Sequence, residues 1–174
     1  AERLNDALVA LAERVARDLP HVTLTFAAGK RDYDRTAANL KGSAAAGCPR
    51  VSLLDYIYDM PVRMAAADLV VSRAGAMTVS ELSLLGKAAV LVPSPYVADN
   101  HQLRNAQALV RAGAGVCVEE DGLPGGALER AVLPLLAQSA ERAAMGQRLQ
   151  EGFACPDANE RLCVELLRLA RGQA

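Results

Sequence analysis

The segment that decides the fold is Ala67-Asp-Leu-Val-Val-Ser-Arg-Ala-Gly-Ala-Met-Thr-Val-Ser-Glu-Leu82, in which a predicted strand turns directly into a predicted helix. Residues 69–71 form a short apolar run typical of a buried strand, and Gly75 allows the backbone to turn closely. From Thr78 onward, apolar residues recur at helical spacing, so we expect a helix over residues 78–85. Free amide groups at a helix start bind anions. The segment therefore predicts an anion site, with Glu81 placed to accept hydrogen bonds from the hydroxyl groups of a sugar.

The same residues also have a purely structural interpretation. Thr78-Val-Ser-Glu81 has the spacing of a capping box, in which the first and last side chains satisfy each other's backbone amides. Asp99 to Gln102 repeats this spacing at a second predicted helix start. A four-residue motif does not separate a helix cap from a ligand site, so both interpretations stay open at this point.

The composition predicts one globular domain over residues 1–174, because 52% hydrophobic residues are enough for a core. A net charge of −1 and an aromatic content of 3% argue against nucleic acid as a partner. No apolar run reaches the roughly 20 residues of a transmembrane helix, and no signal segment is recognisable. A cytoplasmic location is therefore the default expectation.

The four cysteines lack the spacing of a metal site or a disulfide framework, and they have no companion histidines. We expect reduced, mostly buried thiols at Cys48, Cys117, Cys155 and Cys163. No metal and no cofactor are therefore expected.

Predicted strands and helices alternate along the chain. We expect strands over residues 22–26, 51–54, 69–71, 88–92 and 116–118, and helices over residues 2–19, 33–46, 78–85, 101–111, 124–137, 140–150 and 159–170, with a short helix from Pro61. Because the strands are apolar on both faces, they predict a doubly wound α/β domain with a parallel sheet covered on both sides. Such sheets bind ligands at the carboxyl ends of their strands. A doubly wound domain normally begins with a strand, so we expect a first strand upstream of residue 1 to be missing.

Five stretches together resemble the C-terminal, donor-binding half of the MurG family of glycosyltransferases. They are Tyr56-Ile-Tyr-Asp-Met60, Ala65-Ala-Ala-Asp68, Ser72-Arg-Ala-Gly-Ala-Met-Thr-Val-Ser-Glu81, Gly86-Lys-Ala-Ala-Val-Leu-Val-Pro93 and Asp99-Asn-His-Gln-Leu-Arg-Asn-Ala106. The family transfers N-acetylglucosamine from UDP-N-acetylglucosamine to lipid I (undecaprenyl-pyrophosphoryl-MurNAc-pentapeptide), which forms lipid II for peptidoglycan. Its members have two Rossmann-like halves in the GT-B arrangement, with the reaction in the cleft between them. The resemblance runs to about residue 170 and implies the C-terminal half without its first strand and that strand's Gly-Gly-Ser loop.

The resemblance implies substrate-binding roles for nine residues. Ile57 would contact uracil through its backbone, and Arg73 would pack beside the nucleotide. The diphosphate and sugar would lie against Ala76, Met77 and Thr78, and Glu81 would hold the ribose hydroxyls. His101 and Gln102 occupy the place of a Gln-Gln pair that recognises the hydroxyls of N-acetylglucosamine, and Asn105 belongs to the same set. His101 departs from the family pattern, so Gln102 is the firmer assignment.

The resemblance also implies what this chain does not hold. The acceptor site for lipid I, the catalytic base and the membrane-contacting patch would lie in the N-terminal domain, so no catalytic residue is expected here and residues 155–174 would end the domain as a helix. The full-length enzyme would be inverting and metal-free, and peripheral at the inner face of the cell membrane. Two further hypotheses are a stand-alone nucleotide-sugar-binding module and another GT-B UDP-glycosyltransferase. An NAD-dependent oxidoreductase would need a Gly-x-Gly-x-x-Gly turn, which is not found after any strand.

Overall fold

The computed structural model describes residues 2–171 and has an α/β architecture in which every strand pairing is parallel. One sheet has two strands, β1 (Leu24–Ala27) and β2 (Val51–Leu54). The other has three strands in the order β3 (Val70–Ser72), β4 (Ala89–Leu91) and β5 (Val116–Cys117). The expected α/β fold with parallel strands is confirmed.

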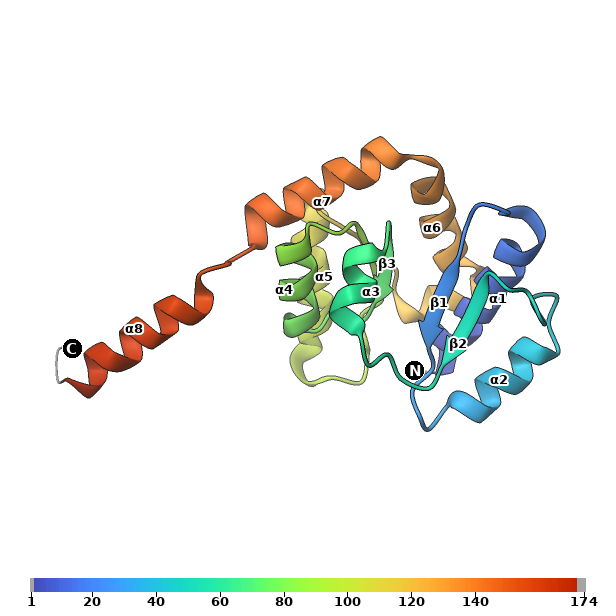
Figure 1. Cartoon of the computed structure of the whole chain (residues 1–174), viewed down its shortest axis with the longest axis horizontal. Coiled ribbons are helices and arrows are strands. Elements are labelled where there is room, and N and C mark those ends of the chain that lie inside the picture. Colours follow the sequence, from blue (N-terminus) through green and yellow to red (C-terminus); the bar gives the residue numbers. More distant parts are fainter. Residues whose placement is uncertain (1, 172–174) are drawn as a thin grey trace.

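The helices surround these two sheets (Figure 1). They are α1 (Glu2–Asp18), α2 (Tyr33–Lys41), α3 (Met60–Ala66), α4 (Ala76–Leu85), α5 (His101–Arg111), α6 (Ala127–Ala137), α7 (Ser139–Phe153) and α8 (Ala158–Ala170), with 3-10 turns η1 (Ala98–Asn100) and η2 (Glu120–Gly125). None of the helices in residues 2–171 is long and apolar enough to cross a membrane.

Several predicted helix boundaries differ from the structure, α7 for example ending at Phe153 rather than at residue 150, and three of the differences have a local cause. Helix α4 begins at Ala76 rather than Thr78, because Gly75 is its N-cap. Helix α2 ends at Lys41, since Gly42 caps it and turns replace the expected continuation to residue 46. The helix expected over residues 124–137 is divided into η2 and α6 at Gly126, whose φ of 74° is left-handed. By contrast, α5 has the predicted bounds.

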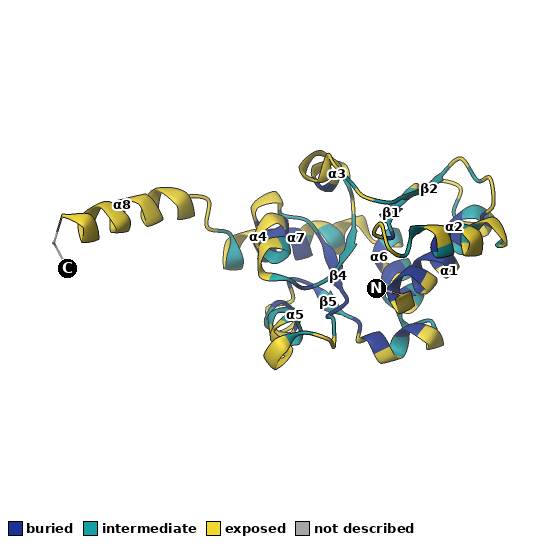
Figure 2. Cartoon of the chain, turned by 90° about the horizontal axis from the view of Figure 1, so that it is seen from below, coloured by how far each residue is buried: buried dark blue, intermediate teal, exposed yellow. Residues whose placement is uncertain are grey.

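One of two hydrophobic clusters joins the two sheets. Its buried residues come from α1, from β1, from β4 and from α6, and include Leu11, Phe26, Val90 and Leu128. Strand β4 is buried along its whole length, as the burial colours of Figure 2 show, because helices cover both of its faces. The continuous apolar sequence of this strand is therefore explained by its central position.

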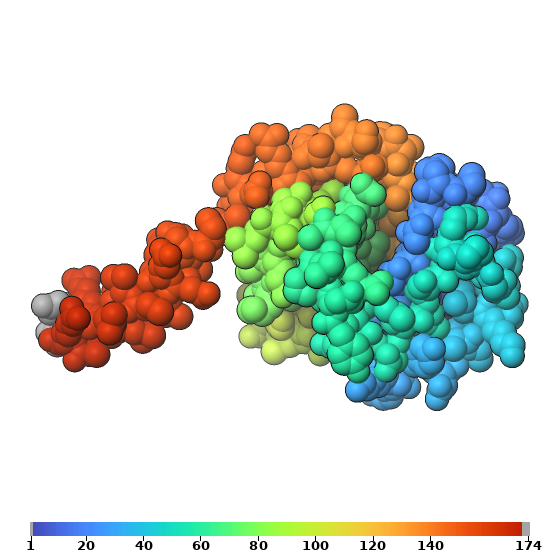
Figure 3. Space-filling view, viewed as in Figure 1, coloured from blue at the N-terminus to red at the C-terminus, as the bar shows by residue number. Residues whose placement is uncertain are grey.

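The parallel sheet that was expected to be continuous is interrupted between β1 and β3. Among the described residues, β1 pairs only with β2, and β3 pairs with β4 alone. Figure 1 shows β1 lying between β2 and β3, and the space-filling view in Figure 3 shows the surface hollowed between the parts that contain β1 and β3. The facing edges of these two strands therefore carry backbone groups with no strand partner in residues 2–171.

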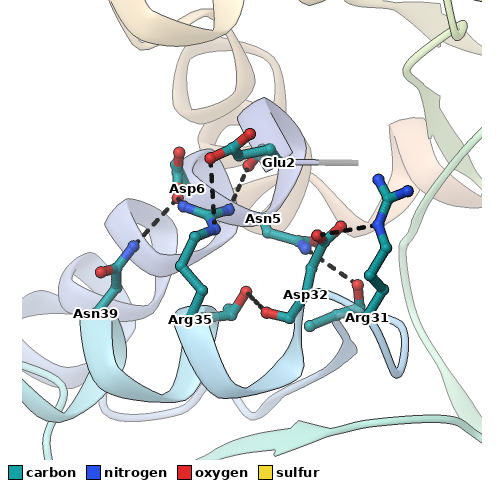
Figure 4. A network of polar contacts seen from close by, with 9 residues as sticks. Glu2, Asn5, Asp6, Arg31, Asp32, Arg35 and Asn39 are labelled. Atoms are coloured by element: carbon teal, nitrogen blue, oxygen red, sulfur yellow. Dashed lines mark hydrogen bonds and ion pairs between the residues drawn. The ribbon is translucent and has the colours of Figure 1, made fainter.

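Side-chain contacts join α1 to α2 beside the carboxyl end of β1 (Figure 4). Arg35 donates to Asp6 at 2.7 Å and to the carbonyl oxygen of Glu2 at 3.3 Å. The buried Asn5 donates from Nδ2 to the carbonyl oxygen of Ala28 at 3.0 Å. These contacts position the chain that leaves β1 against the start of α1.

Helix α8 extends away from the rest of the domain, and all of its residues are exposed (Figure 2). Five large apolar residues on it have exposed fractions of 56–61%, namely Leu162, Val164, Leu166, Leu167 and Leu169. A helix was expected over residues 159–170, and the structure has it from Ala158. Of the rest of the segment assigned to the C-terminal helix, residues 155–157 are not helical, and residues 172–174 lie outside the described residues.

Candidate functional site

The turn after β3 leads directly into α4 and leaves backbone amides free. Gly75, the N-cap, has an extended backbone with φ −67° and ψ 149°. The first helical hydrogen bond runs from the amide of Val79 to the carbonyl of Gly75 at 3.0 Å. The amides of Ala76, Met77 and Thr78 therefore precede the helical ladder and point out of the helix start. Three such donors, together with the positive end of the helix dipole, suit an anion.

Neither of the two predicted capping boxes forms. No side chain hydrogen-bonds to the start of α4, and Thr78 lies in its first turn rather than at its cap. At α5, the N-cap is Asn100 in a left-handed conformation, again without a side-chain cap. Both capping interpretations are wrong, because each helix begins at a different residue from the one the motif suggested. Glu81 and Gln102 are therefore not helix caps.

Glu81 lies on α4 with its carboxylate exposed. None of the described residues hydrogen-bonds or forms an ion pair with it. It borders an apolar hollow of about 170 Å³ between α3 and α4, which is lined by Met60, Pro61, Met64, Leu84 and Leu85 as well. A carboxylate without a protein partner, beside an apolar surface, can accept two hydrogen bonds from vicinal hydroxyl groups of a ligand.

Arg73 connects the carboxyl ends of β3 and β4 to the chain that follows β5. Its Nη1 atom donates to the carbonyl oxygens of Val92 at 3.2 Å and Pro93 at 3.3 Å, and to Oε2 of Glu120 at 2.8 Å. The side chain of Arg73 is 25% exposed, and that of Glu120 is 5% exposed. Nε and Nη2 of Arg73 have no hydrogen-bond acceptor among the described residues, so one side of the guanidinium stays available to a ligand.

Helix α5 contributes side chains to the same edge of the sheet. Asn105 donates from Nδ2 to the carbonyl oxygen of Ala74 at 2.9 Å, which fixes the turn after β3. Gln102 accepts the amide of Ser94 on Oε1 at 2.9 Å, which holds the loop after β4. The Gln102 amide nitrogen has no protein partner among the described residues. Both residues therefore support loops, and Gln102 keeps a donor for a ligand.

His101 is the first residue of α5, and Ile57 follows β2. Nδ1 of His101 lies 2.9 Å from the carbonyl oxygen of Ala98. Because a carbonyl only accepts, Nδ1 carries the proton in this contact, and Nε2 is left as an acceptor when the ring is neutral. Ile57 lies in the loop after β2 between Tyr56 and Tyr58, whose rings meet edge to face at 5.0 Å.

Glu120 was missed by the sequence analysis, although it contributes the charge that pairs with Arg73. Its only signal is the acidic run that follows the last strand, at the edge where ligands of such sheets bind. Together with Pro93, Ser94 and Asn100, Glu120 lines a second hollow of about 200 Å³. Sequence alone does not reveal a pairing between residues 47 positions apart.

The cysteines lie away from these contacts. All four are free thiols, but the expectation that most are buried is wrong, because Cys155 and Cys163 are exposed and Cys48 and Cys117 are only partly buried. Burial, with a smaller contribution from the charge of Glu119, raises the pKa of the Cys117 thiol on β5. No group of three or more His, Cys, Asp or Glu side chains within residues 2–171 has the arrangement of a metal site.

Comparison with known proteins gives the chain a family. Residues 1–162 match the family described as Glycosyltransferase family 28 C-terminal domain. An enzyme of Acetivibrio thermocellus, UDP-N-acetylglucosamine–N-acetylmuramyl-(pentapeptide) pyrophosphoryl-undecaprenol N-acetylglucosamine transferase, is 46% identical over 123 residues, which are 71% of this chain and 32% of that protein. The protein with the same name from an Exiguobacterium species is 40% identical over 162 residues, 93% of this chain and 42% of that protein. The chain thus spans less than half the length of these relatives.

Solved structures agree with the sequence comparison. The crystal structure of Acinetobacter baumannii MurG superimposes with a TM-score of 0.74 at 26% identity and covers 97% of this chain and 46% of that one. A structure described as the glycotransferase of kitacinnamycin shares the fold, with a TM-score of 0.58 at 19% identity over 86% of this chain and 34% of that one. The chain therefore belongs to glycosyltransferase family 28, and residues 1–162 form the C-terminal domain of that family.

Proposed function

We propose that this chain is the donor-binding half of an inverting glycosyltransferase that moves N-acetylglucosamine from UDP-N-acetylglucosamine to lipid I, forming lipid II in peptidoglycan synthesis. The observation that carries the proposal is the start of α4, where three free backbone amides and the unpartnered carboxylate of Glu81 lie on one helix. The three amides can donate hydrogen bonds to a diphosphate, and the carboxylate can accept hydrogen bonds from a ribose. The names of the relatives from Acetivibrio and Exiguobacterium support the same substrates.

In the proposed complex, the diphosphate lies against the amides of Ala76, Met77 and Thr78. The ribose hydroxyls donate to Glu81, and the uracil meets the backbone of Ile57. When the bond between the sugar and the diphosphate breaks, negative charge builds on the departing UDP. Amides that are already oriented stabilise this charge without reorganisation, so the donor half supplies electrostatic catalysis and no metal is part of the proposal.

The sugar of the donor would meet α5. Gln102 has its oxygen occupied by Ser94, so it would address the sugar through its amide nitrogen, as a donor to one hydroxyl. His101 would offer Nε2 as an acceptor when the ring is neutral. Asn105 acts one step further away, since its bond to Ala74 holds the turn that precedes the free amides.

The attack on the sugar would need groups from the other half of the enzyme. An inverting transfer requires the acceptor hydroxyl of lipid I to approach the anomeric carbon from the face opposite UDP, while a base takes its proton. We place the acceptor site, that base and the contact with the inner face of the membrane in the N-terminal domain. This chain would contribute binding, orientation and stabilisation of the departing group.

Replacing Glu81 by Gln tests the proposal. In the full-length protein, E81Q should weaken UDP-N-acetylglucosamine binding by about 1.5–3 kcal/mol, the range for a hydrogen bond to a charged group. The melting temperature should not change, because Glu81 is exposed and has no partner among the described residues. Calorimetric titration measures the binding.

The matched control is E160Q on α8, an exposed glutamate far from the site along the chain. It should bind the donor like the unmodified protein. Titrating NAD in parallel distinguishes the oxidoreductase hypothesis, since NAD should not compete with the UDP-sugar. If E81Q binds the donor as tightly as the control does, Glu81 does not hold the ribose.

A further inference from the structure

Glu120 is the single charged residue in the buried class among residues 2–171. It opens the η2 turn directly after β5, and its carboxylate lies 2.8 Å from Nη1 of Arg73. Its neighbours Glu119 and Asp121 are exposed. A buried carboxylate loses hydration, and this loss is large unless an opposite charge compensates it. Arg73 provides that compensation.

A buried ion pair of this kind is weak evidence of a role in stability. An apolar pair of similar volume often stabilises a core equally well or better, because neither side chain loses hydration of a charge. What the ion pair adds is a fixed direction for the guanidinium. Arg73 is held by Glu120 and by the carbonyls of Val92 and Pro93, so two segments that are distant from Arg73 in sequence are fixed to one of its atoms, Nη1.

The residue fixed in this way lies two positions before the N-cap of α4. Ala74, between Arg73 and Gly75, is fully buried, and its carbonyl accepts from Asn105. The turn is therefore held on one side by the Arg73 side chain and on the other by α5. Its conformation sets where the amides of Ala76, Met77 and Thr78 point.

We infer that Glu120 is a positioning residue for the diphosphate of the donor, acting through Arg73 on the turn that presents these amides. Glu120 itself does not touch the nucleotide. This inference rests on the proposed function, since it assumes that the diphosphate lies at the start of α4. A change at Glu120 should therefore weaken binding through the phosphates of a ligand and leave the binding of its nucleoside unchanged.

The test compares UDP with uridine in the full-length protein. E120Q keeps the shape of the side chain and removes its charge, and E119Q makes the same change at the exposed neighbouring residue. E120Q should weaken UDP binding roughly 5- to 20-fold, less than the loss of a direct charged hydrogen bond. Uridine binding should stay within about twofold of the unmodified protein, and E119Q should leave both ligands unaffected. The melting temperature is recorded for each variant.

A second variant keeps the test decisive if E120Q does not fold. E120D retains the buried charge and withdraws the carboxylate by one carbon–carbon bond, so it alters geometry alone. It should show the same selective loss for UDP, to a smaller extent. Equal weakening of UDP and uridine, unchanged UDP binding, or tighter UDP binding through a released Arg73 would each overturn the inference. If the unmodified protein does not bind UDP, it is the proposed function that fails.

Discussion

The carboxyl end of the three-stranded sheet is held by side chains from several distant segments, whereas that of the two-stranded sheet relies mainly on one buried amide. At the first edge, Arg73 and Gln102 bind the backbone of the loop after β4, and Asn105 binds that of the turn after β3. At the second, Asn5 reaches the carbonyl of Ala28, and the other contacts beside it are largely exposed ion pairs. Exposed ion pairs contribute little to stability. The edge to which we assign the diphosphate and the sugar of the donor is thus the one whose backbone is fixed in advance, as electrostatic catalysis requires.

The largest expected effect comes from breaking the helix packing behind the three-stranded sheet. Gly146 of α7 lies so close to the end of α4 that an added Cβ would be 2.0 Å from the carbonyl oxygen of Gly86. Gly86 itself closes α4 in a left-handed conformation with φ 59°, so its backbone cannot move freely. G146A should therefore lower the free energy of unfolding by more than about 3 kcal/mol, at or beyond the upper end for overpacking a core. Denaturant unfolding measures the loss.

A glycine on the same helix provides the control. A Cβ added at Gly152 meets nothing within 4 Å. G152A should stabilise the protein by about 0.5–1 kcal/mol, because alanine is the better helix former. Similar destabilisation by both substitutions would mean that the contact between α4 and α7 does not support the three-stranded half.

The corresponding change in the two-stranded half is N5A. It removes the donor to Ala28 and leaves a buried carbonyl without that partner, so we expect a loss of about 1–3 kcal/mol in the free energy of unfolding. Asn39 is the matched control, since it lies in the same network but is exposed. N39A should change stability by less than about 0.5 kcal/mol. If both variants lose equally, the exposed contacts hold this half together and the contrast between the two edges disappears.

The contrast also separates what the sequence predicts from what it does not. Helix α5 has the predicted bounds because its apolar residues follow helical spacing, which is a local signal. The start of α4 was misplaced because Thr78-x-x-Glu81 imitates a capping box, while Gly75 caps the helix through backbone conformation alone. Arg73, Gln102 and Asn105 do gather at one edge, since the carboxyl ends of β3 and β4 meet there, whereas Ile57 follows β2 of the other sheet. Their partners are backbone carbonyls, the backbone amide of Ser94 and the distant Glu120, and the sequence does not reveal these pairings.

A smaller effect is expected at Gln102, and it concerns sugar choice. Q102A should reduce discrimination between UDP-N-acetylglucosamine and its C4 epimer by up to about tenfold, the value of one neutral hydrogen bond. An amide placed for one hydroxyl orientation leaves polar groups unmatched with the other. Binding of UDP should be unchanged. Transfer assays with both donors in the full-length enzyme measure the ratio.

Gln107, exposed on the same helix, is the control for this change, and Q107A should leave the ratio as it is. An equal loss for both sugars and for UDP would contradict the role in discrimination. In that case, Gln102 would contribute only by accepting the amide of Ser94, and its role at the carboxyl end of the three-stranded sheet would be structural.

The smallest effect is expected at the start of α3, which belongs to the three-stranded half but lies outside the loops that Arg73, Gln102 and Asn105 hold. The hydrogen bond from Arg63 Nε to Asp59, at 2.8 Å, holds the pKa of the Asp59 carboxyl below its ordinary value. A folded pKa below the unfolded one stabilises the folded state above the unfolded pKa, and this stabilisation is lost as the pH falls through the folded value. R63Q should therefore raise the pKa of Asp59, as followed by NMR, and reduce stability slightly at neutral pH but not in acid. Donor binding should change little, because α3 makes none of the hydrogen bonds that hold Arg73, Gln102 and Asn105, although it lines the hollow beside Glu81. Weaker donor binding by R63Q would show that α3 also helps to position the donor. The side chains after β3 and β4 would then not be the only groups that do so.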